Sequence, residues 1–443
     1  MTGTPRLVPR TLESAAAAPV AGPITQFHSI CLELLARAER DGYAGYSKFD
    51  ALESPLLRAL SFRWWPLRLV WTQLVTRSPI NLRPLLAVRR GINPEAPALF
   101  ARANLDCLEA GLAGPFAERA RHCLDWLLAH DASSHSAYHG RCWGYHHAWQ
   151  SPGFYQPPNY PNCYITTIVA GALLQGHRRL GTPAYLEAAR NAADFILSDL
   201  PVFHEDGAEK CIAYVPDMQA QFVVININAL AAALLAQVGS RTGERHLVEQ
   251  ARKLMTFVVR QQTPYGAWHY TVNPRQSLVT HDNYHTGMIL DALLGYEQAT
   301  GDARFHAAYA LGLDYYRSAL FLSDGTPKWT NSRRWPHDVH GSAQGTLTFA
   351  LAGDLDTATR IATWALVHFY EAGGMFTYQR GRLVNKRFTL LHWCNGWMVR
   401  GLAALLRAGQ EVRRKVPPPY QGGGKEGNTV PCPSALRSPS HRG

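Results

Sequence analysis

Apolar residues recur at helical spacing along most of this chain, and the apolar stretches come in pairs. From about residue 94 onward, each unit has an apolar helix, a short turn bearing Gly or Pro, and a second helix. An extended piece rich in aromatic and polar residues then leads to the next unit. The turns recur roughly every 50–60 residues, and self-similarity at a fixed spacing indicates a repeat architecture.

The first helices of the units are predicted at residues 163–177, 222–239, 284–299, 340–351 and 392–407. The second helices are predicted at residues 115–130, 184–200, 244–262, 302–320 and 355–372. The helix at 392–407 has no partner downstream, and a helix predicted at 24–38 has none upstream. If these two pair, the array closes into a ring, whereas an open solenoid needs polar capping repeats at both ends. The sequence therefore predicts an all-α fold, an (α/α) toroid of about six helical hairpins.

The toroid is predicted as a single domain over residues 24–408. Residues 1–23 are rich in Pro, Ala and Thr and are predicted to be disordered, as is the basic Pro/Gly-rich tail 409–443. One long helix is expected at Pro55–Arg77, followed by an extended linker.

Charge and cysteine content narrow the functional classes. The net charge is +11, but residues 410–443 hold six Lys or Arg against two Glu, so the body is only mildly basic. That balance suits an acidic substrate and falls short of a nucleic-acid-binding surface. The eight Cys are scattered without paired spacing, which indicates a reducing compartment and neither a disulfide nor a metal framework. With no convincing signal peptide and no apolar window long enough to span a bilayer, we expect a cytoplasmic protein without transmembrane segments.

Two carboxylates at helix starts are the leading catalytic candidates. Asp282 lies in the run from His281 to Gly287, and Asp338 lies in the run from Trp335 to His340. Paired acids can cleave a glycosidic bond, with one protonating the leaving oxygen and the other acting as base or nucleophile. The alternative is that each Asp merely caps its helix. His285 and His340 are candidates for proton transfer, although a histidine in such a place can also be structural.

Aromatic and amide side chains cluster at the same helix starts and suit a sugar, which has apolar ring faces and a rim of hydroxyls. Lys328 can bind an acidic group on the substrate, or it can be a solvated surface residue. About half of the aromatic residues can equally be hairpin packing. No spacing resembles a known metal motif, so neither metal nor cofactor is predicted. The predicted substrate-binding residues are Trp143, Tyr145, Trp149, Gln150, Asn283, Tyr284, Lys328, Trp335, His337, Gln344, Trp393 and Asn395.

Several motifs resemble those of bacterial and archaeal proteins found with polysaccharide-biosynthesis functions. The motifs are Gly45–Leu52, Ser78–Leu86, Trp143–Tyr145 with Trp149-Gln150, Asp282–Gly287 and Pro336–Gln344. That family is similar to the six-hairpin glycosidase superfamily of hydrolases, lyases and epimerases. Some members carry an aminolevulinate dehydratase label, but such an enzyme needs a β/α barrel. Ser47-Lys48 departs from the Asp-bearing version expected in the first motif, so no role is assigned to that loop.

The resemblance implies an enzyme acting on an oligo- or polysaccharide, or on its precursor, in association with polysaccharide-synthesis machinery. Glycoside hydrolysis by the Asp282/Asp338 pair is the first mechanism considered. Epimerisation or elimination at a uronic acid or amino sugar is the alternative, with His or Tyr taking a proton. A non-catalytic glycan-binding component is a further alternative, and a terpene-cyclase-like toroid is disfavoured because its Asp-rich cluster is missing.

Overall fold

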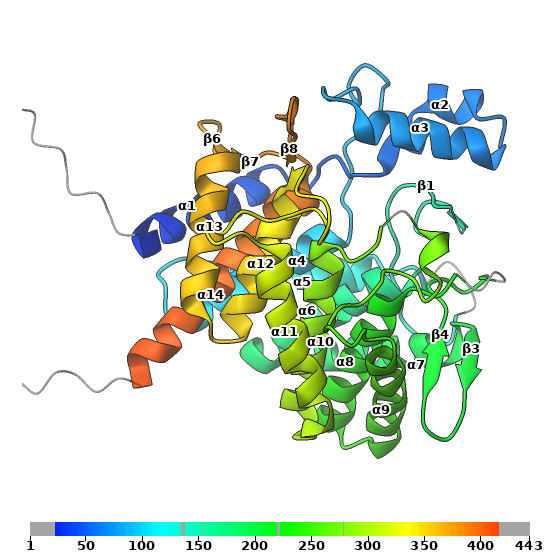
Figure 1. Cartoon of the computed structure of the whole chain (residues 1–443), viewed down its shortest axis with the longest axis vertical. Coiled ribbons are helices and arrows are strands. Elements are labelled where there is room, and N and C mark those ends of the chain that lie inside the picture. Colours follow the sequence, from blue (N-terminus) through cyan, green and yellow to red (C-terminus); the bar gives the residue numbers. More distant parts are fainter. Residues whose placement is uncertain (1–22, 134–137, 153, 219–221, 278, 416–443) are drawn as a thin grey trace, which may run out of the picture.

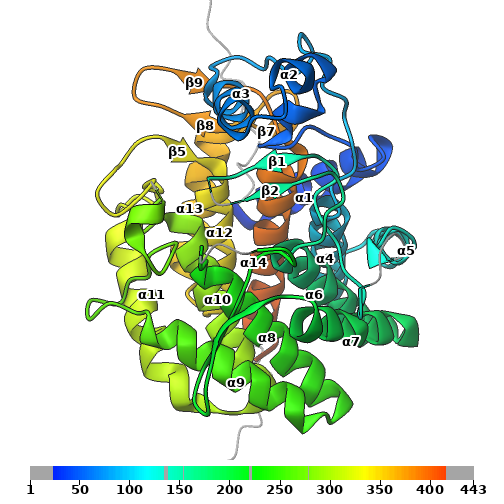
Figure 2. The same cartoon turned by 90° about the vertical axis from the view of Figure 1, so that its right-hand side faces the viewer.

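Six inner helices form a closed ring in the computed structural model, which describes residues 23–133, 138–152, 154–218, 222–277 and 279–415. Each inner helix packs against the next, and α14 packs against both α12 and α4, which closes the ring (Figures 1 and 2). The inner helices are α4 (Glu95–Glu109), α6 (Cys163–Leu180), α8 (Ile225–Thr242), α10 (Asn283–Thr300), α12 (Val339–Leu351) and α14 (Trp397–Lys415).

Six outer helices pack on the inner ring, one for each inner helix. They are α1 (Pro23–Arg40), α5 (Phe116–Ala129), α7 (Pro183–Ser198), α9 (Arg245–Arg260), α11 (His306–Leu320) and α13 (Leu355–Phe369). Helix α1, from the start of the described chain, packs against α14 from its end. The predicted (α/α) toroid, closed by pairing of the first and last helices, is therefore confirmed.

Glycine turns separate the inner helices from the outer ones, as the sequence predicted. Gly181, Gly243 and Gly301 end α6, α8 and α10 with φ of 71°, 78° and 71°. This left-handed conformation is strained for residues with a Cβ and suits glycine at a helix C-terminus.

Burial follows the two-layer arrangement. Almost every side chain of α12 is buried, because its neighbours surround it on all sides, whereas the outer helices are buried on one face only. All six inner helices begin at the same end of the ring, here called the mouth (Figure 2). Short strands and loops leading into these helices gather at that end.

Four small sheets lie on the toroid in the part of the chain that the structure describes. Strand β1 (Trp149–Gln150) pairs with β2 (Tyr155–Gln156), β3 (Val202–Glu205) with β4 (Lys210–Ile212), and β6 (Tyr370–Glu371) with β7 (Met375–Phe376), all antiparallel. The fourth sheet has the order β5 (His337–Asp338), β8 (Gln379–Arg380) and β9 (Asn385–Lys386). In this sheet Asp338 pairs with Gln379, and β5 directly precedes α12.

Residues 45–93, here called the arm, lie over the mouth end (Figures 1 and 2). The helices of this arm correct one prediction. The single helix expected at Pro55–Arg77 is two helices, α2 (Pro55–Leu60) and α3 (Trp65–Arg77). The break falls at Phe62 and Arg63, whose φ values of 47° and 58° are left-handed and end helical progression. Helix α3 packs against β1 and against the short helix η1 (Asp50–Glu53).

The predicted terminal segments lie almost wholly outside the described residues, although α14 continues past residue 408 to Lys415. Among the residues that the structure describes, no helix is long and apolar enough to cross a membrane.

Candidate active site

Side chains from five of the six inner helices meet at the mouth and touch one another in a chain. Tyr164 of α6 bonds to Glu95 of α4, which also bonds to Trp397 of α14. Trp397 stacks on His340 of α12, which stacks on Tyr284 of α10. Because each comes from the first turns of its helix, ring closure alone brings them together.

His340 is the centre of this chain. Its imidazole is fully buried between the rings of Tyr284 and Trp397, with both centroid separations at 4.8 Å. Neither ring nitrogen has a hydrogen-bond partner among the described residues. Burial holds the pKa of His340 well below its ordinary value, and the charge of Lys48 lowers it further. A neutral imidazole with free nitrogens can exchange a proton or a hydrogen bond with a bound molecule.

Glu95 is a buried carboxyl group with two neutral donors on one oxygen. The hydroxyl of Tyr164 and the indole N–H of Trp397 each donate to Oε1 at 2.8 Å, and Nε2 of His392 lies 3.7 Å from Oε2. Burial raises the pKa of Glu95 to about 7, although both donors oppose that shift. A carboxyl group that is half protonated near neutrality is suited to general acid–base work.

Asp338 accepts three hydrogen bonds at the start of α12. Its Oδ1 accepts from the backbone N–H of His340 at 3.0 Å and from the indole N–H of Trp393 at 2.9 Å. Its Oδ2 accepts from the amide of Gln379 at 2.7 Å. The capping role anticipated as an alternative is therefore present, and the tryptophan joins this carboxylate to the aromatic cluster, because the Trp393 ring lies 4.3 Å from that of His340.

Asp282 caps α10 and is joined to His285. The Nδ1 atom of His285 lies 3.0 and 2.9 Å from the two carboxylate oxygens. The His285 ring in turn contacts Tyr284 and Tyr270, with centroids at 4.3 and 4.4 Å. Burial raises the pKa of Tyr284 well above its ordinary value, and the charges of Asp282 and Asp338 raise it further.

Lys48 enters the mouth from the arm. Its Nζ lies 3.7 Å from the centroid of Trp393 and within 6 Å of four more rings, those of Phe49, Tyr284, Trp329 and Tyr378. No hydrogen bond or ion pair of this amine is made within the described parts of the chain. Burial lowers the pKa of Lys48 to about 8, while the charges of Asp338 and Asp282 oppose that shift.

Predicted site residues at the mouth therefore include all four catalytic candidates, Asp282, Asp338, His285 and His340. Tyr284 and Trp393 join them directly, as described above. Tyr145 and Trp149 lie beside them on the loop before α6, where the hydroxyl of Tyr145 is 3.3 Å from that of Tyr214 and Trp149 stacks on Phe49.

Other predicted binding residues occupy structural positions. Trp143 is fully buried and donates its indole N–H to Leu127 O, and Asn283 bridges to α11 through Leu320 O and the Tyr316 hydroxyl. Asn395 receives the backbone N–H of Phe376 and donates to Thr389, so it fixes a loop.

The remaining predicted binding residues lie at separate places in the structure. Gln344 lies deeper in the ring and donates to Asp291 and Thr348, and Gln150 bonds to its own loop. His337 is buried with Nδ1 2.6 Å from Pro327 O, and the half-exposed Trp335 covers its ring. Lys328 is half-buried, and no side-chain partner of it lies in the described residues.

Glu95, Lys48 and Tyr164 were not singled out as site residues. Glu95 follows Asn93-Pro94 at a helix start, as Asp282 and Asp338 begin theirs, and that shared position was the signal available. Lys48 lies outside the repeated units, so the repeat pattern gave no reason to place it at the mouth.

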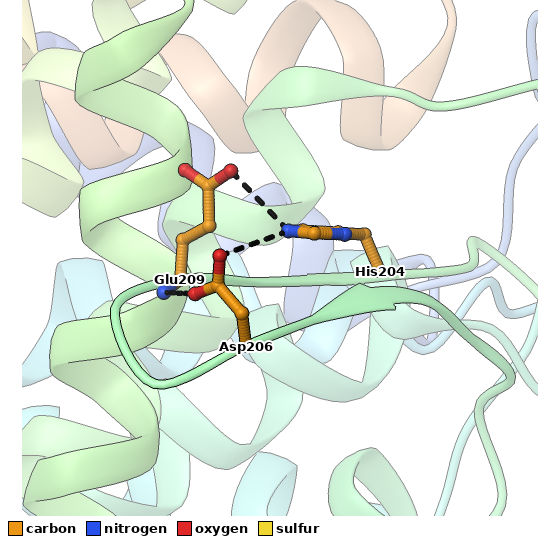
Figure 3. A group of neighbouring side chains, drawn as sticks. All are labelled: His204, Asp206 and Glu209. Atoms are coloured by element: carbon orange, nitrogen blue, oxygen red, sulfur yellow. Dashed lines mark hydrogen bonds and ion pairs between the residues drawn. The ribbon is translucent and has the colours of Figure 1, made fainter.

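Three possible metal ligands come together away from the mouth, although the sequence predicted none. His204, Asp206 and Glu209 lie on the β3–β4 hairpin, with Nε2 of His204 3.5 and 3.4 Å from the two carboxylates (Figure 3). The guanidinium of Arg260 is 3.0 Å from Glu209 and already neutralises it. Asp206 also accepts two backbone N–H groups of its own turn, so these contacts are those of an ordinary exposed hairpin.

Comparison with solved structures identifies the fold class. An unsaturated glucuronyl hydrolase specific for heparin matches with a TM-score of 0.59 at 11% identity, covering 88% of this chain and 98% of that chain. A GH76 α-mannanase from Bacteroides thetaiotaomicron matches with 0.55 at 12% identity, covering 73% and 87%. A cellobiose 2-epimerase from Bacillus thermoamylovorans matches with 0.53 at 10% identity, covering 72% and 90%.

At these identities the likeness shows the fold, which is the six-hairpin (α/α) toroid of these enzymes, as the sequence motifs predicted. No protein-family model matches the chain, and no curated protein matches it in sequence. A fold of this kind hosts several chemistries, so activity has to be argued from the mouth residues.

Proposed function

We propose that this protein is a carbohydrate-active enzyme that binds an oligo- or polysaccharide, or its precursor, at the mouth of the toroid. The support is the combination of flat aromatic side chains with acid–base groups in one place. Tyr284, Trp393 and Trp397 supply aromatic rings at the mouth, while Glu95 is hydrogen-bonded to Trp397 and Asp338 to Trp393. The named fold neighbours, two hydrolases and an epimerase, add support at the level of architecture.

The reaction we assign first is glycoside hydrolysis. Asp338 acts as the base or nucleophile, because it is a carboxylate oriented by three donors. Glu95 acts as the acid, since its pKa of about 7 leaves it a proton to donate near neutrality. Asp282, the other predicted member of the pair, orients His285 beside Tyr284. The observation that carries this proposal is the chain of touching rings, Trp397, His340 and Trp393, that links the Glu95 and Asp338 carboxyl groups.

The substrate in this proposal carries an acidic group. Lys48 supplies the cation, in place of the role predicted for Lys328, because its amine is caged by aromatic rings and lacks a partner in the described chain. A substrate carboxylate bound there recovers the hydrogen bonds and charge pairing that burial denies the amine. The predicted link to polysaccharide-synthesis machinery stays a prediction.

One observation favours a second candidate, epimerisation or elimination. His340 is neutral, central and without hydrogen-bond partners on either nitrogen among the described residues. A neutral imidazole can remove a proton from a carbon next to a carbonyl or carboxylate, with Lys48 stabilising the charge that develops.

The test compares the wild type with Glu95→Gln, Asp338→Asn and Asp282→Asn on neutral and uronic-acid oligosaccharides, with products resolved by chromatography and mass spectrometry. Hydrolysis predicts new reducing ends, lost by a factor of about 10² or more in Glu95→Gln and Asp338→Asn. In D₂O, deuterium on the sugar carbon without cleavage identifies epimerisation, and an unsaturated product identifies elimination. Full turnover by Asp338→Asn overturns the carboxylate mechanism, and binding without any turnover indicates a glycan-binding protein.

A further inference from the structure

The arm over the mouth end exposes an unusual amount of apolar side chain. Large hydrophobic residues face outward along α2, the turn after it and α3. Phe62, at the tip of the turn, is 77% exposed. We call this set the α2–α3 patch: Leu56, Phe62, Trp64, Trp65, Val70 and Leu74. So many exposed large apolar side chains on one short segment indicate an interaction site.

The backbone of the turn holds the patch in this position at a cost. Phe62 and Arg63 both adopt left-handed φ, at 47° and 58°. Such a conformation costs of order 1 kcal/mol for each non-glycine residue. Both the backbone strain and the exposure of the Phe62 ring are explained if this ring inserts into an apolar environment outside the protein.

The charged residues of the stretch that carries α2 and α3 all have one sign. Between Ser54 and Pro94 the sequence has seven Arg and neither Asp nor Glu. Arg58, Arg63 and Arg77 are exposed beside the patch, and no carboxylate among the described residues pairs with any of them. The arm therefore combines aromatic and aliphatic side chains with uncompensated guanidinium groups.

A second element with the same character stands next to the arm. The β8–β9 hairpin ends in Arg382, Leu383 and Val384, and Leu383 is 92% exposed. Lys386 of this hairpin donates to Thr76 O at the end of α3, so the two elements are joined. Both project from the mouth end of the toroid (Figures 1 and 2).

From these observations we infer that the α2–α3 patch, with the tip of the β8–β9 hairpin, binds the headgroup region of an anionic lipid bilayer. Trp and Phe insert at the boundary between headgroups and acyl chains, and arginines pair with anionic headgroups. The protein binds the membrane peripherally, because these elements lie on the bilayer surface rather than across it.

A second copy of this chain fits the surface less well. A symmetric dimer brings the same patch of both copies together, so the arginines of one copy face those of the other. Like charges opposed across an apolar interface are repulsive. An anionic bilayer satisfies both the apolar and the basic halves of the surface at once.

The experiment is sedimentation of the full-length protein with large unilamellar vesicles of phosphatidylcholine, with and without phosphatidylglycerol. The double variant Phe62→Ser/Trp64→Ser removes patch members, and Val367→Ser/Leu311→Ser is the matched control, since Val367 is 71% exposed on α13 and Leu311 is exposed on α11. Arg63→Glu/Arg77→Glu tests the charge, with Arg40→Glu/Arg275→Glu as a control of equal charge change. The basic tail is the same in every variant, so differences report the arm.

The expected result is binding that requires phosphatidylglycerol and weakens about tenfold or more in each arm variant, with both controls like the wild type. Circular dichroism and turnover of a soluble substrate are expected to be unchanged, because the substituted side chains are exposed and do not belong to the mouth cluster. Equal binding to both vesicle types, or arm variants that bind as the wild type does, overturns the inference. So does concentration-dependent self-association that the Phe62→Ser/Trp64→Ser variant abolishes while vesicle binding is nil, since the patch then serves a second copy.

Discussion

The guanidinium of Arg83 lies 2.6 Å from the carboxylate of Asp50, and both side chains are 1% exposed. This pair joins two of the motifs singled out in the sequence, Gly45–Leu52 and Ser78–Leu86. Arg83 also donates to the carbonyls of Ser47 and Lys48, at 2.7 and 3.1 Å. The two motifs together thus fix the backbone from which Lys48 reaches the mouth.

Breaking this pair is expected to destabilise the protein strongly. Asp50→Asn leaves the Arg83 charge buried without its counter-ion, which costs about 3–5 kcal/mol of unfolding free energy. The exposed pair Arg90–Asp41, at 3.8 Å, is the control, and Asp41→Asn is expected to cost less than about 1 kcal/mol. Urea unfolding followed by circular dichroism measures both. Equal small effects in the two variants would show that the buried pair contributes no more to the unfolding free energy than the exposed pair does.

Glu95 is expected to make stability fall as pH rises. Its folded pKa of about 7 lies above the ordinary 4.5, so between these values the folded state holds the extra proton. Its stabilising contribution is complete below pH 4.5 and is lost as pH rises through 7, by roughly 3 kcal/mol. Unfolding free energies of the wild type and Glu95→Gln at pH 5 and pH 8 give the difference. The amide keeps an acceptor for Tyr164 and Trp397, so a difference that does not change with pH would contradict the raised pKa.

Lys48 is expected to make binding of acidic sugars pH-dependent. The amine carries its charge below a pKa of about 8, so affinity for a uronic-acid oligosaccharide should fall as pH rises through 8. Calorimetric titration from pH 6.5 to 9.5 measures this, with the matching neutral oligosaccharide as control. Lys48→Met should weaken the acidic ligand about tenfold or more at pH 7 and flatten the pH profile. An unchanged profile in this variant would assign the anion to another group.

His340→Phe is expected to separate stability from activity. Phenylalanine keeps the stack with Tyr284 and Trp397 and removes two buried nitrogens without partners in the described chain, so unfolding free energy should stay within about 1 kcal/mol of the wild type. Turnover should fall by a factor of about 10² if the imidazole transfers a proton or holds the substrate. Thermal melts and product assays decide, and an active variant would leave His340 as packing alone.

The repeat pattern predicted the fold well because helix pairs are a local, periodic property of the chain. It also placed Asp282, Asp338 and His340 at the starts of inner helices, where ring closure brings them together. The break between α2 and α3 was missed, since the left-handed turn at Phe62 has no glycine to announce it.

The site was predicted less completely than the fold. Trp143 and Asn395 have side chains suited to sugars, but packing around them, which residue type does not encode, buries both in structural contacts. Glu95 was overlooked for a related reason, since its raised pKa arises from neighbours contributed by α6 and α14, far away in sequence.

The packing of α14 against both α1 and α4 bears on how the protein is made. Trp393 and Trp397, two walls of the mouth, leave the ribosome after the other five inner helices of the ring. Until they emerge, the first hairpins lack a neighbour and Glu95, Tyr164 and Tyr284 have no shared enclosure. A nascent chain that still lacks α14 therefore has an open ring and an incomplete mouth, so any activity can appear only once α14 has joined its neighbours.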